Sequence, residues 1–195
     1  PTVVPELAEW HGKAGDFKVT SNTRLVIDAN AKDIATKAAQ AFQVDYKEAT
    51  GKELAIVTDE TAKPGDIFFT KDTTNNLGKE GYIMDIDDIV TIKAEQATGA
   101  YWSTRSMLQI LKLEDDTMPK GLTRDYPKYS VRSFSLDVAR KPVSMETLNS
   151  IAKEMAYYKM NDFQVHLNDN LIFYEDYGSV ETAMEKAYTG FRLES

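Results

Sequence analysis

The sequence predicts an α+β domain followed by a separate strand–helix–strand unit, and three observations lead to this expectation. Short apolar runs and two helical patterns follow one another without strict alternation between residues 17 and 113. A polar stretch with two prolines then covers residues 119–132. Beyond it, a strand, a helix and a second strand follow in order. The pattern between residues 17 and 113 is typical of helices packed on one face of an antiparallel sheet. The strand–helix–strand order after residue 132 is typical of parallel strands joined by a helix.

Two helices are expected in the first domain. Apolar residues recur at helical spacing from Ile34 to Phe42, with Asn30 as the expected N-terminal cap and Gly51 as the stop. A second helix is expected over residues 97–113, where apolar side chains again recur every three or four residues.

The strands of this domain are expected between and before the helices. Residues 17–29 contain two short β-like runs, and residues 53–59 and 66–72 are short and apolar. Residues 81–94 alternate on two arms and predict a hairpin. Three acidic pairs are interpreted as solvated turns: Asp59-Glu60, Asp87-Asp88 and Asp115-Asp116.

The polar stretch 119–132 is interpreted as a domain linker. It places the first domain at residues 1–125 and the second at residues 129–195. In the second, a strand is expected over 133–139 and another over 163–167. The helix between them is expected to begin at a Ser144 cap and to end at Asn161.

This strand–helix–strand unit predicts a candidate site. Neighbouring parallel strands end at the same sheet edge, where ligands bind in α/β folds. Arg140 follows the first strand and Asp169 the second, so the two side chains are expected to lie close together. His166 lies on the strand face opposite the apolar residues, and Asp137 lies within the first strand. A purely structural role remains open for each of these residues: His166 as a hydrogen-bonded core residue, Arg140 and Asp169 as a structural ion pair, and Asp137 as a core carboxylate.

Composition narrows the classes of function. A net charge of −8 weighs against nucleic acid as a partner, because phosphate contacts require Lys and Arg. The negative charge favours a neutral or cationic small molecule as the ligand, or simply serves solubility. With no cysteine and two distant histidines, a metal site is not expected, and no cofactor is predicted. No apolar run reaches the roughly 20 residues needed to span a bilayer. The start at Pro1 and the abrupt end at 190–195 suggest a piece of a longer protein.

Residues 133–170, SFSLDVARKPVSMETLNSIAKEMAYYKMNDFQVHLNDN, resemble the opening of the catalytic barrel of glycoside hydrolase family 20. The family pattern is D-x-x-R at the first strand end, Met-Ala-x-x-K-x-N at the helix end and H-x-H-L-x-D at the second strand end. Here Asp137–Arg140, Met155–Asn161 and His166–Asp169 correspond. The preceding residues, with VPELAEWHGKAGDF (4–17) and TGAYWSTRSMLQIL (98–111), resemble the α+β domain that usually precedes that barrel.

The resemblance implies an α+β N-terminal domain followed by the truncated start of a (β/α)8 TIM barrel. Family members remove terminal β-linked N-acetylhexosamine from glycans with retention, and the substrate's own 2-acetamido oxygen is the nucleophile. An adjacent Asp-Glu pair after the fourth barrel strand orients that group and supplies the general acid/base. No catalytic residue is therefore expected in this chain, and the isolated 195-residue chain is predicted to be inactive.

The resemblance also implies roles for the candidate residues. Arg140 is expected to bind sugar hydroxyls, because a guanidinium can donate two hydrogen bonds to neighbouring oxygens. Asp169, His166 and Asp137 are expected to support the site. The sequence departs from the family pattern at Asn170, where many members have a second Asp, and at Lys141-Pro142, where many have a histidine or an aromatic residue.

Further expectations concern partners and location. N-acetylhexosamine-containing glycans are the expected partners, and an extracellular or cell-surface location in a bacterium is expected. Because two strands cannot close a barrel, residues 129–195 are expected to dock on the first domain, to self-associate into a homo-oligomer or to be held by more of the chain. Two other functions remain open: a lacto-N-biosidase that releases a disaccharide, which HLNDN (166–170) favours, and a non-catalytic glycan-binding or accessory module. An unrelated α/β protein is a third reading.

Overall fold

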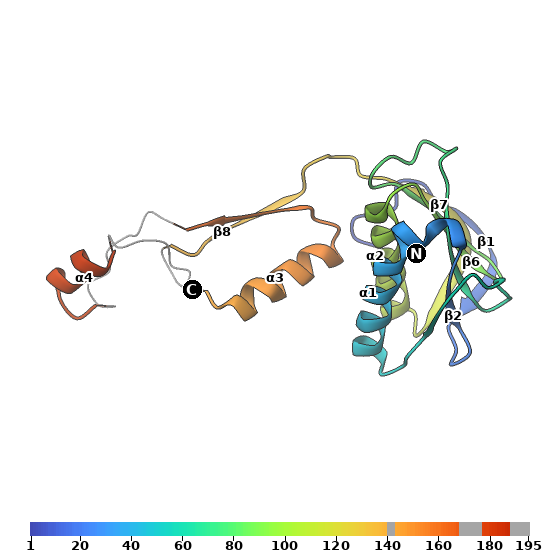
Figure 1. Ribbon diagram of the computed structural model, residues 1–195, viewed down its shortest axis with the longest axis horizontal. Coiled ribbons are helices and arrows are strands. Elements are labelled where there is room, and N and C mark those ends of the chain that lie inside the picture. The colour runs from blue at the N-terminus through green and yellow to red at the C-terminus, as the bar shows by residue number, and fades with distance from the viewer. Residues whose placement is uncertain (140–142, 168–176, 188–195) are drawn as a thin grey trace. The chain divides into compact units, whose positions relative to one another are not determined.

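The computed structural model describes residues 1–139, 143–167 and 177–187 (Figure 1). The chain divides into two compact units, Pro1–Ser130 and Val131–Ser195. Each unit is described by itself.

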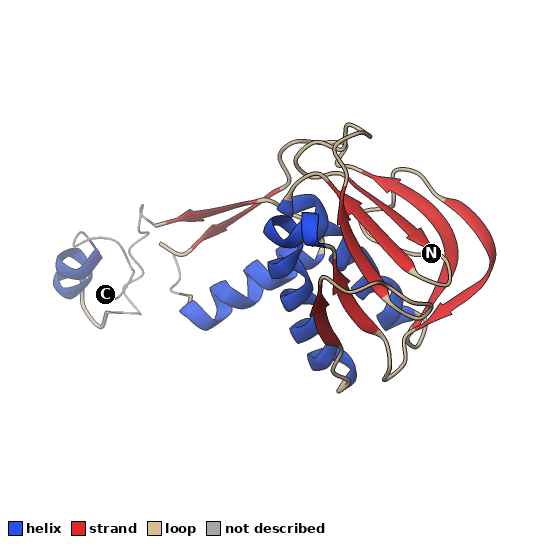
Figure 2. Cartoon of the chain, turned by 45° about the vertical axis from the view of Figure 1, so that its right-hand side comes forward, coloured by secondary structure: helices blue, strands red, loops and turns tan. Residues whose placement is uncertain are grey.

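The first unit is a seven-stranded sheet with two helices on one face (Figure 2). Its strands are β1 (His11–Lys18), β2 (Arg24–Ile27), β3 (Ala55–Thr58), β4 (Ile67–Lys71), β5 (Tyr82–Ile86), β6 (Val90–Ala94) and β7 (Thr117–Asp125). They lie in the order β1-β7-β5-β6-β4-β2-β3. A short 3-10 turn η1 (Ala29–Ala31) precedes α1 (Lys32–Thr50), and α2 is Ala97–Leu113. Helix α1 packs on β2, β3 and β4, and α2 packs on β5, β6 and β7.

The sheet is mixed, whereas the sequence predicted an antiparallel one. Strand β2 pairs in parallel with both β3 and β4, and β4 pairs in parallel with β6. The β5–β6, β5–β7 and β1–β7 pairs are antiparallel. The crossover through α1 connects β2 to β3 and makes these two strands parallel. The predicted layer of helices on one face and the 81–94 hairpin are confirmed.

Helix α2 is the centre of the core. Twelve of its residues are buried: Gly99, Ala100, Trp102, Ser103, Thr104, Arg105, Ser106, Met107, Leu108, Gln109, Ile110 and Leu111. Its start approaches the loop before β5 so closely that a Cβ on Gly99 would lie 2.2 Å from the carbonyl oxygen of Gly81. A larger residue at position 99 would therefore push this helix end away from the sheet.

The predicted linker at residues 119–132 is wrong in its first half. Residues Thr117–Asp125 form the nine-residue strand β7, which joins β1 to β5. The buried positions of this strand include Gly121, Thr123 and Asp125, so apolar alternation is absent from its sequence. Thr123 satisfies its hydroxyl by donating to the carbonyl oxygen of Glu9 at 2.6 Å.

The predicted helix boundaries of the first unit are confirmed at one end of α1 and wrong at the other. Gly51 ends the helix with φ 74°, and its N–H donates to the Lys47 carbonyl at 2.8 Å. Asn30 does not cap the helix, because the cap position is Ala31. The Asn30 side-chain oxygen instead accepts a hydrogen bond from the Lys71 N–H at 3.2 Å.

Asp116 is buried, which corrects its interpretation as part of a solvated turn. The residue is 5% exposed, and its carboxylate accepts a hydrogen bond from the Tyr46 hydroxyl at 2.6 Å and pairs with Lys52. Its main-chain oxygen accepts from the Val19 N–H at 2.8 Å. Burial by itself would raise the pKa of Asp116, but the hydrogen bonds from Lys52 and Tyr46 outweigh it, and the pKa is lowered.

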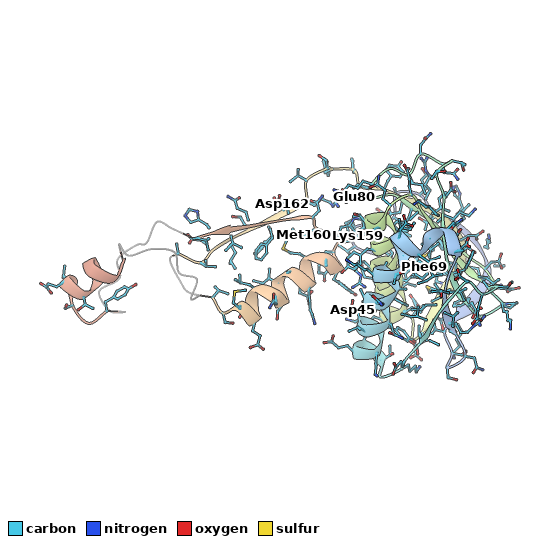
Figure 3. All side chains as sticks on the ribbon, viewed as in Figure 1. Asp45, Phe69, Glu80, Lys159, Met160 and Asp162 are labelled. Atoms are coloured by element: carbon cyan, nitrogen blue, oxygen red, sulfur yellow. The ribbon has the colours of Figure 1, made fainter. Side chains whose placement is uncertain are left out.

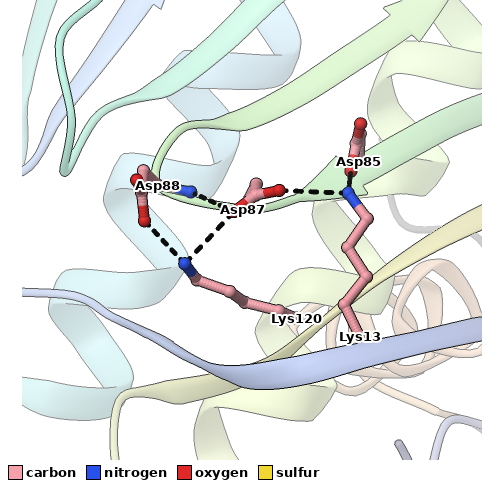
Figure 4. Close-up of polar contacts among 5 residues, drawn as sticks. All are labelled: Lys13, Asp85, Asp87, Asp88 and Lys120. Atoms are coloured by element: carbon pink, nitrogen blue, oxygen red, sulfur yellow. Dashed lines mark hydrogen bonds and ion pairs between the residues drawn. The ribbon is translucent and has the colours of Figure 1, made fainter.

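The other acidic pairs are exposed and ion-paired. Lys13 on β1 contacts Asp85 and Asp87 at 2.6 and 3.2 Å, and Lys120 on β7 contacts Asp87 and Asp88 at 3.1 and 2.6 Å (Figure 4). The hydrogen bonds from Lys120 and Lys13 lower the pKa of Asp87. Exposed pairs of this kind contribute little singly, but here they join the edge strand β1 to the β5–β6 turn. The Asp59-Glu60 pair likewise binds Lys32 and Arg24.

The described residues of the second unit form two parallel strands and two helices. Its elements are β8 (Ser133–Asp137), α3 (Met145–Tyr157), β9 (Asp162–His166) and α4 (Val180–Ala187). The Ser144 cap is confirmed, because its hydroxyl accepts from the Thr147 N–H at 3.1 Å. The helix ends at Tyr157 rather than Asn161, and Lys159 follows with φ 57°.

We predict that Asp116→Ala lowers the free energy of unfolding by about 2 kcal/mol, because the buried Tyr46 hydroxyl loses its acceptor. Urea unfolding measures the change. Asp115→Ala is the matched control: Asp115 also has positive φ but is exposed, so it carries the same backbone strain without the buried contact. Equal losses in the two variants would contradict the role of the carboxylate.

The lowered pKa of Asp116 also fixes a pH dependence. A depressed carboxyl pKa contributes stability above the unfolded-state value of about 3.9, and this contribution is lost as pH falls through the folded-state pKa. The difference between wild type and Asp116→Ala should therefore be largest near neutral pH and shrink below about pH 4.

Candidate functional site

The candidate site lies where β8 and β9 end. The two strands pair in parallel, in register from Ser133↔Asp162 to Asp137↔His166. Helix α3 lies alongside them in both views (Figures 1 and 2). The predicted parallel pairing is therefore confirmed, and the two strands leave the sheet at the same edge.

Asp137 and His166 are brought side by side by this register. Register partners project to the same face of a parallel pair, and the Val138 N–H donates to the His166 carbonyl at 3.0 Å. Both side chains are half-buried. The opposite face carries Phe134 and Phe163, whose ring centroids are 6.0 Å apart. The polar and apolar faces of the unit are thus separated as the alternation predicted.

The Asp137 carboxylate has a defined partner. Its Oδ1 accepts a hydrogen bond from the Ala139 N–H at 3.0 Å. Ala139 is fully buried and Val138 is 3% exposed. The chain therefore leaves β8 through a buried segment whose amide is satisfied by the side chain of Asp137.

The other predicted site residues lie outside the described residues. This applies to Arg140 and Asp169, and also to the departures from the family pattern at Lys141-Pro142 and Asn170. The predicted meeting of Arg140 with Asp169 stays a prediction.

The amino end of the strand pair has its own clamp, which the sequence did not reveal. The Asn161 side-chain oxygen accepts from the Arg132 N–H at 2.9 Å, and the Asn161 N–H donates to the Arg132 carbonyl at 3.0 Å. The Arg132 guanidinium donates to the Lys159 carbonyl at 2.7 Å. Lys159, Met160 and Asp162 lie at this end of β9 (Figure 3). The sequence signal was Asn161 itself, which was interpreted as a helix end.

Two features are absent from the described part of the chain: a cluster of metal ligands and a helix that could span a membrane. No group of three or more histidine, aspartate or glutamate side chains there is arranged to hold a metal ion. Within the same residues, no helix is both long and apolar enough to cross a bilayer.

Comparison with known families decides the classification. The family profile described as "Glycosyl hydrolase family 20, domain 2" matches residues 1–126. The profile described as "Glycosyl hydrolase family 20, catalytic domain" matches residues 129–174. The chain belongs to glycoside hydrolase family 20. The family predicted from residues 133–170 is thus confirmed, as is the fold prediction of an α+β domain followed by the start of the catalytic domain.

Curated relatives of this family share about a quarter to a third of the aligned residues. A lacto-N-biosidase from Bifidobacterium bifidum is 27% identical over 168 residues, which cover 83% of this chain and 14% of that protein. An N,N'-diacetylchitobiase from Vibrio harveyi is 31% identical over 165 residues, which cover 82% of this chain and 18% of the relative. The chain therefore spans less than a fifth of the length of these two family 20 proteins.

Solved family 20 structures have the same fold. The exo-β-N-acetylglucosaminidase from Vibrio harveyi, in complex with N-acetylglucosamine, has a TM-score of 0.74 at 20% identity and covers 86% of this chain and 25% of that one. The β-N-acetylhexosaminidase from Streptomyces coelicolor has a TM-score of 0.70 at 24% identity and covers 86% and 35%.

We predict that Asn161→Ala frees the amino ends of β8 and β9, because the Arg132 N–H loses its acceptor, at a cost of about 1 kcal/mol. Amide hydrogen exchange resolved by residue measures the effect as faster exchange in both strands. Asn161→Asp keeps an acceptor oxygen in the same place and serves as the control. Equal acceleration of exchange in both variants would contradict the role of the side-chain oxygen, because it would show that the strand ends depend on the side-chain NH2 group of Asn161.

Proposed function

We propose that this chain is a part of a retaining glycosidase that removes terminal β-linked N-acetylhexosamine from glycans. The observation that carries the proposal is the order of the two family 20 profiles, domain 2 at residues 1–126 and the catalytic domain from residue 129. The names of the relatives, which include several β-hexosaminidases, support the same reaction.

Within this proposal, Arg140 binds hydroxyl groups of the terminal sugar. It follows β8 at the carboxyl edge of the strand pair, the edge where barrel enzymes bind their substrates. A guanidinium is charged at every physiological pH and presents several donors in a fixed plane. Asp169 and His166, at the end of β9, support the polar surroundings of the sugar.

The proposed chemistry is substrate-assisted. The 2-acetamido oxygen of the bound sugar attacks its anomeric carbon, and a general acid protonates the leaving oxygen. We expect the Asp-Glu pair that orients the acetamido group and moves the proton to follow the fourth barrel strand, as the sequence resemblance implies. The described residues of this chain include two strands of that barrel, and we propose that the chain is inactive alone and that the longer protein is active.

A second candidate reaction is the release of a disaccharide. The likeness to the Bifidobacterium bifidum lacto-N-biosidase favours it. A third candidate, a glycan-binding or accessory module without hydrolysis, would use the first unit alone. The two reactions differ in the size of the glycone that is released, a monosaccharide or a disaccharide, and the module differs from both in having no turnover.

Location and assembly are also part of the proposal. We propose an extracellular or cell-surface site in a bacterium, where glycan substrates are displayed. Apolar side chains of the second unit, among them Phe134 and Val131, are exposed. These surfaces and the free strand edges would be covered by further chain, or by a second copy in a homo-oligomer.

We predict that the product of the whole gene hydrolyses a chromogenic N-acetyl-β-glucosaminide and that the 195-residue chain does not. Arg140→Ala in the long protein should lower kcat/KM about 100-fold, because charged hydrogen bonds to the sugar are lost. Arg124→Ala, an arginine substitution in the first unit, is the matched control and should leave kcat/KM near wild type.

A lacto-N-bioside substrate run in parallel separates the candidate reactions. Turnover of the lacto-N-bioside substrate alone would contradict the proposed hexosaminidase activity and support the lacto-N-biosidase activity. No turnover of either substrate by the long protein would contradict both and leave the binding module.

A further inference from the structure

The two tryptophans of the chain differ in what their indole N–H groups contact. Trp102 on α2 is 7% exposed, and its indole N–H donates to the Glu80 carboxylate at 2.8 Å. Trp10, just before β1, is half-buried, and its indole N–H has no hydrogen-bond partner among the described residues. Its nitrogen is not one of the side-chain atoms that are buried there without a partner, so water reaches it. Part of the Trp10 ring and one donor are therefore available to a ligand.

Two glycines make room for the Trp10 ring beside the β1–β7 pair. Gly12 is the register partner of Gly121. A Cβ on Gly121 would lie 2.5 Å from Cζ2 and Cη2 of the indole, and a Cβ on Gly12 would lie 3.5 Å from its Nε1. The six-membered part of the indole therefore rests close against the main chain at Gly121, where a side chain would displace it.

The main chain on both sides of Trp10 is fixed to β7. Before it, the Thr123 hydroxyl donates to the Glu9 carbonyl oxygen at 2.6 Å. After it, His11 pairs with Leu122 in the antiparallel ladder. A ring that is already held in place loses little conformational freedom when a ligand binds, so more of the contact energy appears as affinity.

We propose that Trp10 is a stacking platform on the first unit for a sugar ring of an N-acetylhexosamine-containing glycan. The inference rests on the proposed function, which supplies the class of ligand. A β-linked pyranose presents a face of C–H bonds, and an indole that covers this face removes apolar surface of both partners from water. The indole N–H is a donor only, and a sugar hydroxyl or the acetamido carbonyl oxygen can accept from it.

The charge of the chain fits a neutral glycan. The net charge of −8 disfavours binding of an acidic polysaccharide, whereas N-acetylhexosamine is uncharged. A second point of contact with the same glycan raises the apparent affinity for a long chain through effective concentration. The platform would therefore favour extended glycans over single sugars.

A purely structural role for Trp10 predicts a different result. The ring would then only cover the main chain at the two glycines, and no sugar would change its surroundings. The environment of the indole N–H during a titration with sugar separates the two roles.

The experiment titrates the 195-residue chain with N,N′,N″-triacetylchitotriose and follows the two indole N–H signals by nitrogen–proton NMR. We expect a saturable shift of the Trp10 signal, while the Trp102 signal stays in place because its N–H is bonded and its ring is buried. Mannitol has hydroxyl groups but no ring face, so it should leave both signals unchanged.

Three variants assign the binding to the ring, with the main-chain amide signals of Gly12 and Gly121 as the readout. Trp10→Ala should abolish the shifts caused by the sugar. Trp10→Phe keeps an aromatic face but loses the N–H, so the dissociation constant should rise about 5-fold. Tyr126→Ala removes an aromatic side chain that is 47% exposed, and this control should bind like wild type.

Three results would overturn the inference: no saturable shift of the Trp10 signal, an equal shift with mannitol, or undiminished affinity in Trp10→Phe. Thermal unfolding shows whether each variant is folded, and Trp10→Phe decides the question if Trp10→Ala does not fold. The titration requires no turnover. A failure of the proposed function would instead appear as absence of hydrolysis by the long protein, which distinguishes the two failures.

Discussion

Every main-chain amide and carbonyl group removed from water needs a hydrogen-bond partner. The two units of the chain meet this constraint in different ways. In the first unit, the sheet runs without a break from β1 to β3, and two helices cover one face. In the second, β8 pairs with β9 alone among the described residues, so both outer edges face away from the pair. Parallel strands are normally buried on both faces and flanked by neighbours. We therefore expect the β8–β9 pair to need further surfaces for its stability, and we expect the seven-stranded sheet of the first unit not to need them.

The first unit meets the constraint with buried polar side chains as well as with its sheet. Tyr82 is 1% exposed, and its hydroxyl donates to Asp125 at 2.7 Å and lies 2.7 Å from the Ser106 hydroxyl. Burial raises the pKa of Tyr82 well above its usual value. The other carboxylate oxygen of Asp125 accepts from the Ala8 N–H at 3.0 Å. One aspartate at the end of β7 thus holds the N-terminal segment against the sheet, just before the chain leaves this unit.

Much of the fold could be predicted because apolar spacing marked it. The helices around Phe42 and Trp102 and the hairpin at 81–94 have clear periodicity. Strand β7 was missed because glycine, threonine and aspartate occupy its buried positions. The parallel pairings were missed because local patterns do not reveal which strands become neighbours. Asp116 was predicted to be exposed because two adjacent aspartates usually indicate a solvated turn. The sequence does not show that a buried tyrosine, Tyr46, lies next to this carboxylate.

The candidate site was predictable in outline but not in detail. Strand order predicted that the two strands end at one edge, and the register brings Asp137 and His166 side by side, which the sequence analysis did not predict. The hydrogen bond from Ala139 to Asp137 had no sequence signal beyond an aspartate near a strand end. Asn161 was interpreted as the residue that ends the helix, whereas its side chain binds the Arg132 N–H at the start of the strand pair. Asparagine is common both at helix ends and in turns, so the sequence does not distinguish the two.

The dependence of the second unit on further chain is the central claim, and residue-resolved hydrogen exchange tests it most directly. The amides of β8 and β9 are compared in the dilute 195-residue chain and in the product of the whole gene. We expect slow exchange of β5, β6 and β7 in both proteins, and slow exchange of β8 and β9 in the long protein only. Equal protection of β8 and β9 in both proteins would contradict the claim, because it would show that the strand pair is stable without the rest of the protein.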